Sequence, residues 1–115
     1  MVLNREQILN KSGAFRTKQV NVPEWDGDVI IKELSGRDFV EMQKESSEDN
    51  MKPDYYGKII QMSVVDEAGK KMFSKADVEA LSELGGTILT NLVKEIVEFN
   101  RMKDVDGAVE ETIKN

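Results

Sequence analysis

The sequence predicts an α+β fold that is mainly helical, with an N-terminal β-hairpin packed on a small bundle of about four helices. Two β-prone segments, QVNVPEW and DVIIKEL, flank the dipeptide Asp26-Gly27, and such a dipeptide favours a tight hairpin turn. Apolar residues recur at helical spacing over residues 87–102, which predicts the longest helix. We expect residues 1–103 to form a single domain and residues 104–115 to form a C-terminal tail, a weak helix prone to fraying.

A short helix is predicted at the N-terminus. Asn4 is a good first-turn cap, and Gln7 follows it by three residues, which is the spacing of a capping box. Gly13 is expected to end this helix.

The hairpin that follows is predicted to turn at Asp26-Gly27 as a two-residue type I′ turn. With that turn, Trp25 would lie opposite Asp28 and Val22 opposite Ile31. Alternation then gives one face that packs on the core, made of Val20, Val22, Val29 and Ile31. The other face would hold Trp25, Pro23 and Ile30. Because proline donates no N–H, Pro23 predicts an edge strand or a bulge.

Two helices are predicted in the middle of the chain. Ser35 is a good N-cap, and Asp38 places a negative charge in the first turn after it. A polar stretch at residues 44–53 is predicted to be the main loop, with Pro53 suited to open the next helix. That helix is expected over residues 54–65, where the apolar positions at helical spacing are Tyr56, Ile59, Ile60 and Val64.

The C-terminal half continues with a turn at residues 66–69 and a short extended piece, KKMF. Ser74 is predicted to cap the next helix with Asp77 at its third position, and Gly85-Gly86 to end it. In the helix over 87–102, one apolar stripe is formed by Ile88, Leu89, Leu92, Val93, Ile96 and Val97.

Composition excludes several classes of function. The chain has no cysteine and no histidine, so disulfides, thiol nucleophiles, zinc sites of Cys and His, and imidazole catalysis are excluded. Its net charge is -6, whereas nucleic-acid binders need a cationic surface. The sequence contains no long apolar run, so we expect neither a membrane span nor a signal peptide. The acidic surface fits a partner with basic faces, or serves solubility alone.

Two short acidic segments suggest calcium-binding loops, but neither meets the requirements of an EF-hand. The segments are Asp66-Glu67-Ala68-Gly69 and Asp104-Val105-Asp106-Gly107. Neither supplies oxygen ligands at all the positions that an EF-hand loop requires. The sequence therefore predicts no metal site, no cofactor and no catalytic residue, and we expect the protein not to be an enzyme.

Four motifs, in this order, resemble those of the tail assembly chaperones of long-tailed bacteriophages and prophages. They are LNREQIL, VNVPEWDGDVIIKELSGRDF, KIIQMSVVDEAGKKMFSKADVEALSEL and LVKEIVEFNRM. The resemblance covers roughly residues 3–103, whereas residues 104–115 match poorly. Its most specific parts are the hairpin around VPEW that leads into the GR dipeptide, and the segment VVDEAGKKMFS.

The resemblance implies a non-catalytic protein that acts in the host bacterial cytoplasm during tail morphogenesis and is absent from the mature virion. It implies two partners, the tape measure protein and the major tail tube protein, and neither nucleic acid nor membrane. Self-association in several copies and a frameshifted longer product are left open. The alternative is a structural virion component, such as a head–tail connector or a tail terminator protein.

The sequence also gives a hypothesis about the contact surface. Apolar content exceeds what one small core requires, so we expect a partner groove between the 87–102 helix and the 54–65 helix. Tyr55, Tyr56 and Met62 would lie near this groove, and Trp25 is the further partner-binding candidate.

Overall fold

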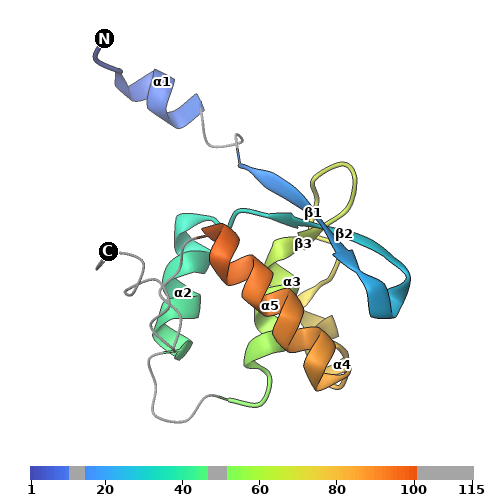
Figure 1. The fold of residues 1–115 in the computed structure, drawn as a ribbon. Helices are drawn as coiled ribbons and strands as arrows, with labels where there is room; N and C mark the ends of the chain where they lie inside the picture. The colour runs from blue at the N-terminus through green and yellow to red at the C-terminus, as the bar shows by residue number, and fades with distance from the viewer. Residues whose placement is uncertain (11–14, 47–51, 101–115) are drawn as a thin grey trace, which may run out of the picture.

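The computed structural model describes residues 1–10, 15–46 and 52–100, and it confirms the predicted α+β, mainly helical fold. An N-terminal hairpin lies against a group of helices (Figure 1). The elements in chain order are α1 (Arg5–Leu9), β1 (Thr17–Val22), β2 (Gly27–Lys32), α2 (Gly36–Ser46), α3 (Tyr55–Ser63), β3 (Val64–Val65), α4 (Val78–Ser82) and α5 (Gly86–Asn100). The predicted tail at 104–115 lies outside the described residues.

Helix α1 begins with the predicted capping box. The Asn4 side chain accepts from the Gln7 N–H at 2.8 Å, and the Gln7 side chain accepts from the Asn4 N–H at 3.0 Å. The helix has no buried residue and lies apart from the sheet and the other helices (Figure 1). Gly13, expected to end this helix, lies outside the described residues.

The sheet has three antiparallel strands in the order β1-β2-β3. The third strand is a correction, because Val64 was expected at the end of a helix. Helix α3 instead ends at Ser63, and the two β-branched residues after it pair with Ile30 and Ile31 of β2. Strand β1 lies at the sheet edge, as Pro23 just after it predicts.

The predicted hairpin turn is wrong in its position. Val22 pairs with Gly27 rather than with Ile31, so four residues connect the strands. Pro23–Trp25 form a turn of 3-10 helix, and Asp26, not glycine, takes the left-handed conformation with φ 54°. Proline fixes its φ at a value suited to the first residue of such a turn, so the turn begins at Pro23.

The predicted faces of the hairpin survive this correction, because the register moved by an even number of residues. Val20, Val22 and Ile31 are buried, and Val29 packs against the core. Trp25 leaves the strand altogether and lies in the turn. The core cluster joins these strand residues to α3, α4 and α5.

The helix boundaries follow the local signals. The Asp38 N–H donates to the Ser35 hydroxyl at 3.1 Å, and Ser74 forms a capping box with Asp77. A 3-10 turn at Lys75–Asp77 precedes α4, and α5 begins at Gly86. Helix α3 begins at Tyr55, after a turn that contains Pro53. Lys71 of the KKMF segment forms an isolated bridge to Val65, whereas Met72 and Phe73 lie in a bend, so the expected extended piece is limited to its start.

Helix α5 lies beneath the hairpin (Figure 1). The predicted stripe is confirmed, since Leu89, Leu92, Val93, Ile96 and Val97 are buried. Polar contacts fix the helix to β1: Arg16 donates to the Phe99 carbonyl at 2.7 Å and lies over the Phe99 ring, and Lys18 pairs with Glu95 at 3.2 Å. The position of α5 relative to β1 creates the groove described next.

Candidate partner-binding surface

The structure places the four predicted partner-binding residues in different environments. Trp25 is 39% exposed in the hairpin turn. Tyr55 and Met62, only 6% and 8% exposed, belong to the core cluster. Tyr56 is half-buried and packs against that cluster, with its ring centroid 6.0 Å from that of Tyr55. Trp25 and Tyr56 are therefore the two that a partner reaches without disturbing the core.

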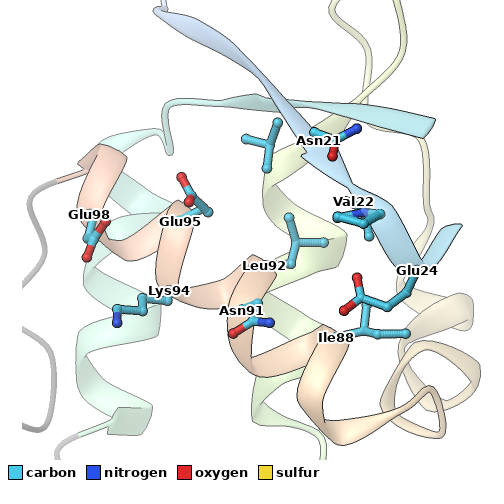
Figure 2. A pocket seen from close by; sticks show the side chains of 11 residues that line it. Asn21, Val22, Glu24, Ile88, Asn91, Leu92, Lys94, Glu95 and Glu98 are labelled. Carbon is cyan, nitrogen blue, oxygen red and sulfur yellow. The ribbon is translucent and has the colours of Figure 1, made fainter. Parts of the chain in front are cut away.

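A groove lies between β1 and α5. It has a volume of about 530 Å³, and we call it the β1–α5 groove. Its wall from the hairpin is residues 20–24, and its wall from α5 is Ile88, Asn91, Leu92, Lys94, Glu95 and Glu98. Figure 2 shows Val22 and Glu24 of the hairpin facing Leu92 and Ile88 of α5 across this space.

The groove has an apolar floor and a charged rim. Val20, Val22 and Leu92 are buried and Ile88 is half-buried, so they form the floor. The α5 residues recur at intervals of three and four, which places them on one side of the helix. Because they lie one above another along α5, the groove runs with the helix axis.

The rim is acidic. Glu24, Glu95 and Glu98 face the groove with a single lysine, Lys94. Within the described ranges, Glu24, Lys94 and Glu98 form no ion pair, whereas Glu95 pairs with Lys18. The Lys18–Glu95 pair is half exposed, so solvent weakens it. The rim thus favours a cationic partner.

A second cavity of about 760 Å³ lies on another part of the molecule. It is lined by residues 52–54 before α3 and by residues of the 75–83 segment. Lys52 and Lys75 face Asp54, Glu79 and Glu83 there. The mixture of charges gives this cavity no clear preference for a ligand.

Polar contacts on the outer face of the hairpin hold β1 and β2 together. Hydrogen bonds from Asn21 and Gln19, each 2.8 Å long, lower the pKa of the exposed Asp28 carboxyl. These bonds favour the ionised carboxylate. The three residues are engaged with one another and are not arranged as a catalytic group.

Neither metal binding nor a bilayer span finds support in the part of the chain that the structure describes. No group of three or more acidic side chains there is placed to hold a metal ion. The Asp66 carboxylate accepts instead from the Ala68 and Lys70 main-chain N–H groups of its own turn. None of the described helices is both long and apolar enough to cross a bilayer.

The β1–α5 groove was not predicted from the sequence. Two signals for it were present: Pro23 indicated an edge strand, and α5 showed a clear amphipathic pattern. The sequence did not indicate the angle at which α5 packs against the sheet. That angle depends on contacts between residues far apart in sequence, such as Arg16 with Phe99.

Comparison with known proteins finds similarity to phage tail assembly chaperones. A family model described as phage tail assembly chaperone matches residues 4–114. Among solved structures, the chain is similar to the tail assembly chaperone of bacteriophage HK97, with a TM-score of 0.59 and 25% sequence identity, over 82% of this chain and 94% of that chain. The search among curated proteins found no match.

Proposed function

This chain belongs to the phage tail assembly chaperone family, and from that membership we propose that it binds the tape measure protein of its phage and helps to recruit tail tube subunits. The observation that carries the proposal is the family match over residues 4–114. The likeness to the HK97 chaperone, which spans most of both chains, supports it.

The proposed mechanism is the covering of exposed apolar surface. A long helical tape measure protein presents apolar stripes before the tube surrounds it, and large exposed apolar patches promote aggregation. Several copies of a small acidic chain would cover these stripes and add negative charge, since this chain has a net charge of -6. Weak binding would allow release when tube subunits compete.

The proposal includes the absence of catalysis and the place of action. The protein works as a binding module in the host bacterial cytoplasm, with the tape measure protein and the major tail tube protein as partners. It is not retained in the mature virion. Neither nucleic acid nor membrane takes part.

We place the partner contact at Trp25, Tyr55, Tyr56 and Met62, with different roles. Trp25 and Tyr56 are accessible and contact the partner directly. Aromatic side chains supply large contact areas at interfaces. Tyr55 and Met62 belong to the core, and the Tyr55 ring lies beside that of Tyr56.

Co-expression with the tape measure protein of the same phage tests this function. We expect the chain to raise the soluble fraction of the tape measure protein and to copurify with it. Trp25→Ala should reduce both, because it removes an exposed aromatic contact outside the core. Val40→Ala is the matched control, since Val40 is 65% exposed on α2. A tape measure protein that stays insoluble with the wild-type chain would contradict the proposal.

A further inference from the structure

Strand β1 presents an unpaired edge to solvent. The Glu33 N–H donates to the Arg16 carbonyl at 2.9 Å, and in an antiparallel ladder the hydrogen-bonded pairs alternate. The main-chain groups of residues 18, 20 and 22 therefore face β2. Those of Thr17, Gln19 and Asn21 point away from it, and β1 has no other strand beside it among the described residues.

The open edge adjoins the β1–α5 groove. The groove wall from the hairpin begins at Val20 and continues through the end of β1 to Glu24. Figure 2 shows Val22 and Glu24 on the side of the strand that approaches Ile88 and Leu92 of α5. A strand placed beside β1 would thus lie over α5, with every second side chain directed at the apolar floor.

The geometry points to one kind of occupant: we propose that β1 accepts an extended segment of a tail protein by strand addition, and that the side chains of this segment directed at α5 include both apolar residues and lysine or arginine. Main-chain donors and acceptors on the edge would bond to the segment, as in other cases of strand addition. A helix fits this edge poorly, because its main-chain groups bond within the helix.

Charge determines which extended segment fits. The added strand would run past Glu24 at one end of the groove and past Glu95 and Glu98 along α5. Basic side chains on the segment would pair with these carboxylates, and acidic ones would be repelled. The Lys18 side chain pairs with Glu95 and does not block the edge. Pro23, just after β1, limits the pairing of other strands with this edge, because proline has no main-chain N–H to donate.

This inference rests on the proposed function, because the segment is taken to come from a tail protein. An array of overlapping synthetic peptides tests it. The peptides span the tape measure protein and the major tail tube protein of the same phage, and the probe is the full chain. We expect the captured peptides to be basic and to carry apolar residues and lysine or arginine at every second position, on one face of the strand.

Two substitutions at one position separate the main chain from the side chain. Asn21→Pro removes the outward N–H, and an edge strand tolerates this because no ladder bond to β2 is lost. We expect capture to weaken about tenfold, since a main-chain bond and the close approach of the segment are lost. Asn21→Ala keeps the N–H and should capture normally. Circular dichroism and thermal unfolding verify that both variants fold.

A charge reversal provides the second arm of the test. Glu98→Lys should weaken capture of basic peptides, whereas Glu67→Lys, in the exposed turn after β3, should not. Equal capture by Asn21→Pro and Asn21→Ala, or an array without any captured peptide, would overturn the inference. So would sedimentation showing that a second copy of the chain occupies the edge, with wild type self-associating and Asn21→Pro monomeric.

The experiments distinguish a failure of the proposed function from a failure of the proposed strand-addition site. A wild-type chain that solubilises the tape measure protein but shows no edge-dependent capture retains its proposed function and loses this site. A chain that captures peptides through Asn21 but never solubilises the tape measure protein retains the site and loses the proposed function.

Discussion

Gly57 lies where α3 and α4 pack closely against each other. A Cβ atom at this position would meet the Ser82 hydroxyl and lie 2.7 Å from the Val78 carbonyl oxygen. The Ser82 hydroxyl is itself engaged, because it donates to that same carbonyl at 2.8 Å. Backbone and side chain of α4 therefore leave no room for a methyl group.

Gly57→Ala should destabilise the fold by about 1–3 kcal/mol, the range for overpacking a core contact. A loss of stability would be informative, because alanine within a helix normally stabilises a protein by about 0.5–1 kcal/mol relative to glycine. Gly36→Ala is the control, as its Cβ would meet nothing within 4 Å, and it should have a small effect. Urea unfolding measures both. A neutral Gly57→Ala would contradict the close contact of α3 with α4.

Lys58 connects the end of α2 to the start of α3. Its ammonium lies 2.8 Å from Glu45 and 3.9 Å from Asp54. The hydrogen bond to Glu45 raises the pKa of Lys58 above its ordinary value of 10.5. One carboxylate oxygen of Glu45 and one of Asp54 are buried without a hydrogen-bond partner among the described residues, so within that part of the chain Lys58 is the cation that neutralises them.

Lys58→Met should cost about 1–2 kcal/mol at neutral pH, the size expected for hydrogen bonds to charged groups. A raised folded-state pKa contributes stability that is complete below the unfolded value of 10.5 and is lost as pH rises through the folded value. The difference between wild type and variant should therefore shrink in alkaline solution. Unfolding curves from neutral pH to beyond pH 10.5 check this, with Lys75→Met as an exposed control. A difference that is constant across the range would contradict the ion pair.

At the scale of elements, the hairpin turn determines the register of the sheet. The turn places Asp26 at φ 54°, whereas Gly27 begins β2, and a Cβ atom there would lie 3.8 Å from the Trp25 carbonyl oxygen, an ordinary contact. Glycine is therefore not required at position 27.

Gly27→Ala should change the free energy of unfolding by less than about 1 kcal/mol, because the site is extended and open. Asp26→Val should cost about 1–2 kcal/mol, since a β-branched residue is poorly suited to the left-handed conformation. Thermal unfolding of the two variants separates the observed turn from the type I′ turn that the sequence suggested. A type I′ turn would make Gly27→Ala the costly change.

The elements that could be predicted are those specified by nearby residues. The capping pairs at Asn4 and Ser74 and the apolar stripe of α5 are local patterns, and the structure confirms them. Strand β3 and the register of the hairpin could not be predicted in the same way. Both depend on pairing between distant segments, as when Val65 pairs with Ile30. The β1–α5 groove was missed for this reason as well.

The predicted partner-binding residues also show a limit of prediction from the sequence. Tyr55 and Met62 have the pattern of a surface that grips apolar helices, and they also have the pattern of a core. The sequence alone does not separate the two, because both use apolar residues at helical spacing. The structure places them inside the core and leaves Trp25 exposed in the turn.

At the scale of the whole molecule, the fold combines a small core with an acidic surface and an open sheet edge. The net charge of -6 and the acidic rim of the β1–α5 groove both favour basic partners. Under the proposed function, the binding site must be one that a later partner can displace, and an open groove with a charged rim is suited to such reversible binding.

The most direct test of the central proposal, that this protein serves tail assembly and then leaves, is quantitative mass spectrometry of infected or induced cells. The assembling lysate and the purified virions are compared for this chain, with the major tail tube protein as the internal reference. We predict that the chain is abundant in the lysate and absent from the virions. A fixed number of copies retained in every purified virion would contradict the proposal and identify a structural component, such as a head–tail connector or tail terminator protein.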